Sequence, residues 1–304
     1  MTAPEVSVII AAWRAEATLE RAVRSALAQE GVTVEVVVVD DASPDGTEAL
    51  ARRLAAADRR VRAIGLGRNR GPAPARNRAI AEARGTWIAV LDADDAMQPD
   101  RLARMCGLAR EWDADMVLGN LALGDGRPFV PLPPEPAPID LAGWVAGNLA
   151  AANRATLGYL KPLVARGFLA AHGLAYDESL RNGEDFHLVL AVLAAGGRVW
   201  LSPRPDYLYS RRAGSVSHRA DPADLRALAA ADRRFAAQHD DPAIARMLRR
   251  KARATLRLAS AETALAALRT GRPGQAAGVM LRHPAALPRT LRQIAQALRH
   301  RLHP

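Results

Sequence analysis

The stretch WIAVLDADDA at residues 87–96 has the pattern of a buried strand that ends in three carboxylates. A continuous apolar run is typical of a parallel strand that is covered on both faces. In open α/β sheets, ligands bind outside the carboxyl ends of the strands. A carboxylate cluster at such an end is costly unless a cation or hydrogen-bond donors offset its charge. The stretch therefore predicts a strand that brings Asp92, Asp94 and Asp95 to a ligand site.

The segments before this stretch alternate between strand-like and helix-like patterns. Apolar and β-branched runs predict strands at residues 6–10, 32–40 and 61–66. The segments between them have helical spacing, at 18–29, 43–57 and 72–85. Strands that alternate with helices of this length are typical of βαβ units and a parallel sheet. The first hundred residues therefore indicate the α/β class, with an open sheet flanked by helices.

The next part of the chain is less regular. We expect a helix near residues 100–111 and a strand at 114–120. Six prolines between Pro128 and Pro138 indicate an extended loop, because proline fits neither a helix interior nor a central strand. A mixed segment follows, with a strand at 198–202, and helical spacing returns from about residue 221.

Charge also separates the end of the chain from the rest. Residues 221–304 contain 16 Lys and Arg against 6 Asp and Glu, which accounts for the whole net charge of +10. We therefore expect a main domain at 1–220 and a basic helical region at 221–304.

Composition restricts the cellular setting. The single cysteine, Cys106, cannot form an internal disulfide, and we interpret it as a buried helical thiol. No stretch approaches the ~20 apolar residues that span a bilayer, and the N-terminal apolar run lacks the features of a signal peptide. These observations predict a cytoplasmic protein.

Familiar nucleotide motifs do not fit. The stretch GLGRNRG has Arg70 where G-x-G-x-x-G needs its third glycine, and it follows the third predicted strand. A phosphate-binding G-x-x-x-x-G-K-[ST] loop is also absent from the sequence. The carboxylates remain as the chemical signal, although Asp40, Asp45 and Asp100 are equally well explained as loop formers or helix caps.

Four segments taken in order resemble the family-two glycosyltransferases, which have the nucleotide-sugar-binding GT-A fold. They are VSVIIAAW, VVVVDDASPDGT, NRGPAPARNRAIAEARGTWIAVLDADD and NGED, and the resemblance covers roughly residues 5–218. It implies that 1–220 is a GT-A catalytic domain with an open mixed sheet, in which 1–120 is the nucleotide-binding half and 121–220 the acceptor half. The basic helical region at 221–304 would then be a C-terminal extension of that domain. It also implies a metal-dependent inverting transfer from a nucleotide-sugar donor.

The resemblance assigns several residues to the nucleotide. Ala11 and Trp13 match the segment that lies against the base, although the usual proline and hydroxyl residue of that segment are replaced here by alanines. Asp41 matches the carboxylate that reads uracil, which favours UDP. Arg70 and Arg76 match the segment whose basic side chains lie near the nucleotide.

The resemblance also assigns the metal site and the base. Asp92 and Asp94 match the D-x-D motif, with Asp94 the expected ligand of Mg²⁺ or Mn²⁺ and Asp92 nearer the ribose; Asp95 is a secondary candidate. Glu184 and Asp185 match the acidic pair, with Asp185 as general base. The alternative interpretation is that this pair only begins a helix, where acidic side chains interact favourably with the helix dipole.

The segment YSRRAGSVSH resembles the part of the family that closes over the diphosphate. Arg212 is expected to contact phosphate, and His218 to contact phosphate or metal. A single histidine in a loop is often only solvated, and that alternative stays open for His218.

The C-terminal segment TLRQIAQALRHRL predicts a basic amphipathic helix. Its apolar stripe and its arginines fall on different parts of the helix, at Leu291, Ile294, Leu298 and Leu302 and at Arg292 and Arg299. Such a helix is typical of a membrane surface, but packing on the catalytic domain or on a homodimer partner explains it equally well. Nucleic acid is not expected as a partner, because the region has almost no aromatic residues to stack on bases.

Taken together, the sequence predicts a glycosyltransferase that moves a sugar from a UDP-sugar to a saccharide or lipid-linked saccharide acceptor. Exopolysaccharide or cell-envelope glycan synthesis is the expected setting, with peripheral attachment to the inner face of the plasma membrane as an option. Two alternatives are a sugar nucleotidyltransferase, whose usual Gly-rich N-terminal loop is missing, and a non-catalytic membrane-associated nucleotide-binding protein.

Overall fold

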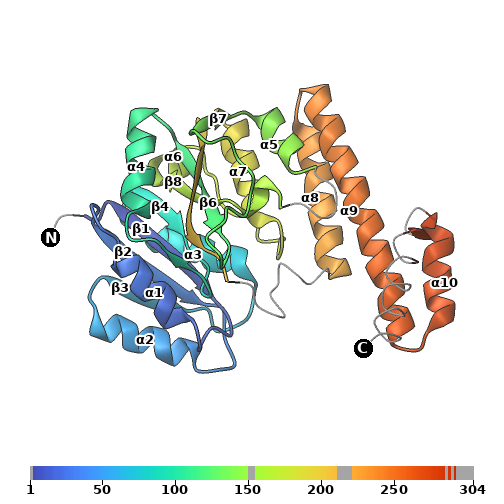
Figure 1. Ribbon diagram of the computed structural model, residues 1–304. Helices are drawn as coiled ribbons and strands as arrows, with labels where there is room; N and C mark the ends of the chain where they lie inside the picture. The colour runs from blue at the N-terminus through green and yellow to red at the C-terminus, as the bar shows by residue number, and fades with distance from the viewer. Residues whose placement is uncertain (1–2, 150–154, 211–220, 285–286, 289–290, 292–304) are drawn as a thin grey trace. The chain divides into compact units, whose positions relative to one another are not determined.

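The computed structural model describes residues 3–149, 155–210, 221–284, 287–288 and 291. The chain forms two compact units, Met1–Arg211 and Arg212–Pro304. The first contains an open sheet flanked by helices, and the second is helical (Figure 1). The predicted domain limits at residues 120 and 220 stay predictions, and the second of them borders a segment outside the described residues.

Four parallel strands form the first half of the sheet, in the order β3-β2-β1-β4. Their bounds are Val6–Ala12 for β1, Val34–Asp40 for β2, Val61–Gly65 for β3 and Trp87–Val90 for β4. Helices α1 (Leu19–Leu27), α2 (Thr47–Ala57) and α3 (Pro72–Glu82) connect them. The predicted βαβ succession is therefore confirmed. It works because each helix packs its apolar face back onto the sheet, as α3 does on β1 and β2.

The second half makes the sheet mixed. Strand β8 (Lys161–Ala165) runs antiparallel between β4 and β6 (Met116–Ala122), and β6 is parallel to β9 (Val199–Leu208). The two-residue strand β5 (Ala96–Met97) and β7 (Ala137–Ile139) both pair antiparallel with β9. The remaining elements of this unit are α4 (Arg101–Glu111), α5 (Leu141–Gly147), the 3₁₀ helix η1 (Leu157–Tyr159), α6 (Arg166–Ala171) and α7 (Glu184–Ala194).

Burial explains why the central strands are continuously apolar. Every residue of β2 and β6 is buried, and β1 has a single partly exposed position. The Pro-rich stretch lies outside regular structure until β7, where Pro138 occupies a short strand paired only with β9 among the described residues. A proline is tolerated there because its missing N–H does not interrupt a central ladder.

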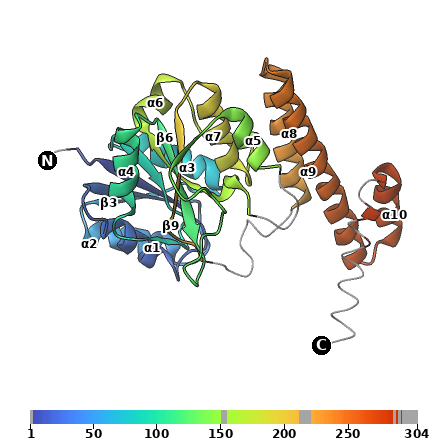
Figure 2. The same cartoon turned by 45° about the horizontal axis from the view of Figure 1, so that its top comes forward.

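The second unit consists of α8 (Pro222–Gln238), α9 (Pro242–Arg269) and α10 (Pro273–Arg282). Asp221 and Asp241 cap the first two helices through hydrogen bonds to backbone N–H groups, and a proline follows each cap. Both α8 and α10 pack on α9 (Figure 2). Leu291 of the predicted amphipathic stripe is exposed, while Ile294, Leu298 and Leu302 lie outside the described residues.

Among the residues that the structure describes, no helix is both long and apolar enough to cross a membrane.

Candidate active site

The backbone after β4 is held in place by three hydrogen bonds. Leu91 N–H donates to Ile9 O at 3.1 Å, and Asp95 N–H donates to Asp92 O at 3.1 Å. Between them, Asp92 N–H donates to the hydroxyl of Tyr207 on β9 at 2.9 Å. The carboxylate segment is therefore a fixed turn at the carboxyl edge of the sheet, as the sequence predicts.

Both oxygens of the Asp92 carboxylate contact cations. Arg76 Nη2, from α3, donates to Oδ1 at 2.9 Å, and Lys161 Nζ, at the start of β8, lies 2.7 Å from Oδ2. Burial acts to raise the pKa of Asp92, but Lys161 and Arg76 outweigh it and hold the pKa well below its ordinary value. Asp92 is therefore an ionised, preoriented carboxylate.

Glu184 and Asp185 begin α7 and meet the same two cations. Gly183, with φ of 81°, turns the chain into the helix. Arg76 Nη1 donates to Glu184 Oε1 at 2.5 Å and lies 3.6 Å from Asp185 Oδ1. Lys161 Nζ lies 3.3 Å from Asp185 Oδ2. The acidic pair therefore begins a helix and also lies beside the partners of the D-x-D segment, and its role as the base stays a prediction.

Lys161 was missed by the sequence interpretation. Its side chain is 9% exposed. Burial acts to lower its pKa, but Asp92 and Asp185 raise the pKa well above the ordinary value, so the ammonium stays charged. The available signal was a lysine at the head of the apolar run KPLVA, since a buried lysine is costly unless carboxylates surround it.

Asp95 is the most deeply buried of the three carboxylates in this segment. It is 1% exposed, and its Oδ1 accepts from Ser210 N–H at 2.7 Å. In the described part of the chain, Oδ2 has no hydrogen-bond partner. Burial, followed by the charges of Asp92 and Asp94, raises the pKa of Asp95 to about 7.

These carboxylates fit a divalent metal only in part. The described residues contain no group of three or more His, Cys, Asp or Glu that could hold a metal ion. Asp92 is held by Arg76 and Lys161, and Asp94 and Asp95 are the other two carboxylates of the segment. Magnesium is commonly held by one or two carboxylates together with substrate phosphates, so this donor set suits a metal that arrives with a diphosphate.

At the same edge of the sheet, just after β2, Asp41 accepts hydrogen bonds from the turn that precedes α3. Its two carboxylate oxygens accept from the N–H groups of Arg70, at 2.7 Å, and Gly71, at 2.8 Å. Burial raises the pKa of Asp41. The Arg70 side chain points to Glu178, with Nη2 2.7 Å from Oε2. Trp13 is 41% exposed just after β1, and the Arg14 guanidinium lies over its ring, 4.7 Å from the centroid.

The structure thus brings together Arg76, Asp92, Glu184 and Asp185, with Lys161 added. It places Ala11 and Trp13 at the end of β1 and immediately after it. Arg212 and His218 lie outside the described residues.

Comparisons of sequence agree on one family. The family model described as "Glycosyl transferase family 2" matches residues 7–149. The succinoglycan biosynthesis protein ExoO of Rhizobium meliloti (strain 1021) is 44% identical over 239 residues, which are 76% of this chain and 68% of that protein. ExoU, a succinoglycan biosynthesis protein of the same strain, is 38% identical over 298 residues, 93% of this chain and 85% of that protein.

Comparisons of structure agree on the fold. S. aureus TarS 1–349 in complex with UDP-GlcNAc matches with a TM-score of 0.65 and 18% identity, over 92% of both chains. The mannosyltransferase PcManGT from Pyrobaculum calidifontis, in complex with GDP-Man and Mn²⁺, matches with a TM-score of 0.58 and 19% identity, over 100% of this chain and 82% of that one. The predicted GT-A architecture, a mixed open sheet flanked by helices, is confirmed.

Proposed function

The chain belongs to glycosyl transferase family 2, and from this membership we propose that it transfers a sugar from a UDP-sugar to a saccharide or lipid-linked saccharide acceptor, with inversion and with a divalent metal. Family membership also favours a glycosyltransferase over the nucleotidyltransferase and the non-catalytic binding protein that the sequence left open.

One observation carries the proposal. Lys161 Nζ lies within 3.3 Å of carboxylate oxygens of both Asp92 and Asp185. The first belongs to the D-x-D segment that follows β4 and the second to the start of α7, 93 positions later in the chain. A donor carboxylate and a base carboxylate are therefore fixed next to one another before any substrate binds, which is the positioning that a displacement at a sugar carbon needs.

In the proposed reaction, Asp185 is the general base. The acceptor hydroxyl oxygen attacks the anomeric carbon of the donor, and the bond from that carbon to the diphosphate oxygen breaks. The hydroxyl proton moves to the Asp185 carboxylate, and the nucleoside diphosphate leaves with the bonding electrons. Such base assistance is typically worth about 10²–10⁴ in rate.

The metal is assigned to Asp94, with Asp95 as the second oxygen donor. A bound Mg²⁺ or Mn²⁺ there supplies electrostatic stabilisation of charge on the departing diphosphate. Asp92 is then available to the ribose, held by Arg76 and Lys161, as the family resemblance implies.

Two further features are part of the proposal. Uridine is chosen over guanosine because Asp41 matches the uracil-reading carboxylate. Exopolysaccharide synthesis is chosen because the relatives at 44% and 38% identity are named succinoglycan biosynthesis proteins.

The test is a calorimetric titration of UDP into the purified chain, with manganese and then with chelator. We expect binding that requires the metal and is lost in Asp94→Ala. The matched control is Asp58→Ala, which removes a carboxylate that follows α2 and pairs with Arg60. Equal UDP binding with and without metal would contradict the metal assignment, and no binding in either condition would contradict the choice of uridine.

We also propose that the second unit attaches to an anionic membrane surface, which makes the protein peripheral on the cytoplasmic leaflet. Five exposed arginines recur at helical spacing along one side of α9, at Arg246, Arg249, Arg250, Arg253 and Arg257. The same unit exposes Leu281 by 82% and Leu291 by 55%. Basic residues near an anionic leaflet are each worth about 1 kcal/mol, and exposed leucines add burial in the interface.

Vesicle flotation tests this attachment. The full chain should float with phosphatidylcholine vesicles that contain phosphatidylglycerol, and Arg→Gln changes at the five α9 positions should abolish it. The control makes the same change at five exposed arginines of the first unit, Arg24, Arg52, Arg59, Arg110 and Arg198. If the two variants float equally, charge alone decides and the α9 surface has no special role.

A further inference from the structure

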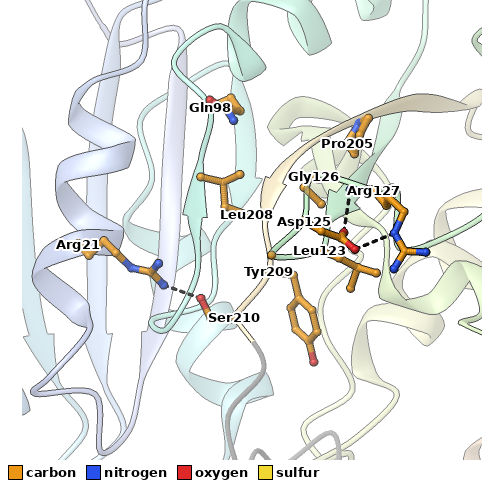
Figure 3. Close-up of a pocket in the computed structure, with 12 residues that line it drawn as sticks. Arg21, Gln98, Leu123, Asp125, Gly126, Arg127, Pro205, Leu208, Tyr209 and Ser210 are labelled. Atoms are coloured by element: carbon orange, nitrogen blue, oxygen red, sulfur yellow. Dashed lines mark hydrogen bonds and ion pairs between the residues drawn. The ribbon is translucent and has the colours of Figure 1, made fainter.

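A cavity of about 830 Å³ lies beside the carboxylate cluster, within the first unit. Its walls come from the start of α1, the segment after β5, the loop that follows β6, and the end of β9. In Figure 3, Arg21 and Ser210 lie on one side of this cavity, Asp125 and Arg127 on the other, and Tyr209 between them. Its volume falls in the range typical of small-molecule sites.

The cavity is joined directly to the D-x-D segment. Arg21 Nη2 donates to the backbone oxygen of Asp94 at 2.5 Å and to Ser210 Oγ at 2.6 Å. Ser210 N–H in turn donates to Asp95 Oδ1. The same charges act on Tyr209. Burial raises the pKa of its hydroxyl, and the negative charges of Asp95 and Asp92 raise this pKa further. A ligand in this cavity would therefore lie next to the carboxylates assigned to the metal and the ribose.

The walls have the composition of a carbohydrate site. An aromatic ring is supplied by Tyr209, whose centroid lies 5.3 Å from that of Phe129. Directional hydrogen-bonding groups surround it: the Asp125 carboxylate, the Arg127 guanidinium and the Gln98 amide. Asp125 and Arg127 are paired at 2.7 Å yet 50% and 75% exposed, so both can reach a ligand. A sugar ring offers apolar C–H faces to aromatic rings and hydroxyls to such polar groups.

We propose that this cavity binds the acceptor saccharide. The inference rests on the proposed glycosyl transfer and names where its second substrate sits. The nucleotide is assigned to Asp41, Trp13 and Asp92, none of which lines the cavity. The proposed acceptor site and these nucleotide residues therefore share no lining residue.

Two substitutions separate this site from the donor site. Gly124→Trp adds a ring to the cavity wall; Gly124 is exposed, lacks a positive φ, and has open space where a Cβ would stand. Its control is Gly167→Trp, at another exposed glycine with open space in α6. Arg127→Ala removes one polar group, and Arg198→Ala is its control, because Arg198 is also an exposed arginine paired with an aspartate.

The experiment measures two ligands on each full-length variant. Oligosaccharides from partial acid hydrolysis of succinoglycan are followed by saturation-transfer NMR, and UDP with manganese by calorimetry. We expect Gly124→Trp to abolish oligosaccharide binding and Arg127→Ala to weaken it about tenfold, the loss of one hydrogen bond to a charged group. Both variants should bind UDP as the wild type does, and both controls should bind both ligands.

The outcomes distinguish the two proposals. Undiminished oligosaccharide binding by Gly124→Trp overturns the acceptor site, and so does a wild-type chain that binds UDP but none of the oligosaccharides. A wild-type chain that fails to bind UDP, while its oligosaccharide binding is lost in Gly124→Trp, overturns the proposed donor and leaves the cavity as a saccharide site.

Discussion

Lys161 Nζ lies 2.7 Å from Asp92 Oδ2, so a buried ammonium is a direct neighbour of the D-x-D carboxylate. The same ammonium reaches Asp185 at 3.3 Å. Among the described residues, removing it leaves Arg76 as the one cation beside both carboxylates. Lys161 therefore fixes the Asp92 and Asp185 carboxylates relative to one another.

Lys161→Met should lower the free energy of unfolding by about 3–5 kcal/mol, the usual cost of leaving one member of a buried ion pair alone. It should also weaken UDP binding, because Asp92 loses its orientation. Urea denaturation and calorimetry measure the two effects. The control is Lys251→Met, which breaks the buried pair with Asp232 in the second unit and should destabilise without changing UDP affinity. Unchanged UDP affinity in Lys161→Met would refute the positioning role.

Asp185→Asn should reduce kcat by about 10²–10⁴ and leave UDP binding within twofold of wild type, because the base acts only on the acceptor hydroxyl. A transfer assay with radiolabelled donor measures the rate. Glu178→Gln is the comparison, since Glu178 is a partly exposed carboxylate that pairs with Arg70. Turnover at the wild-type rate in Asp185→Asn would remove this residue from the base role.

The stability of the metal-free chain should fall as pH rises from about 5 to 8. Burial raises the pKa of Asp95 from 3.8 to about 7, so folding favours its protonated form. That stabilisation is complete below about pH 4 and is lost as pH rises through 7. The pKa of Glu184 is also raised by burial and adds to the same slope. Urea titrations across this range should show a shallower slope for Asp95→Asn; an identical slope would exclude Asp95 as its source.

Gly71→Ala should destabilise the chain by about 1–3 kcal/mol, because φ of 95° with ψ of 176° belongs to a region that essentially only glycine adopts. UDP binding should weaken as well, since Gly71 N–H is held by Asp41. Gly107→Ala provides the contrast: it lies within α4 with open space around it and should gain about 0.5–1 kcal/mol. If the two variants were equally stable, the turn at Gly71 would have to adopt another backbone conformation without cost, and the prediction would be wrong.

The parallel half of the sheet was predictable because its strands are buried on both faces and therefore continuously apolar. Strand β8 was not predictable in this way, because its sequence begins with Lys161 and Pro162 and lies within an irregular segment. Its antiparallel position between β4 and β6 depends on tertiary pairing that no local pattern encodes.

The site was predictable to a similar extent. Asp92, Glu184 and Asp185 are carried by short motifs with recognisable spacing, and the structure brings them to common partners. Arg76 was expected near the nucleotide and is found buried among all three carboxylates, because its side chain reaches from α3 to the start of α7. Lys161 has no motif of its own, because its contacts with Asp92 and Asp185 join three segments that are distant in the sequence.

The loop after β6 closes on itself. Leu123 N–H donates to Arg127 O, and Gly126 N–H donates to Leu123 O, so the turn carries its own backbone bonds outside the sheet. Side chains at positions 123–127 can therefore change without removing a backbone bond of the strands beneath them. With the acceptor site proposed above, changes confined to these five positions would alter which sugar is bound and leave the residues assigned to the donor unchanged.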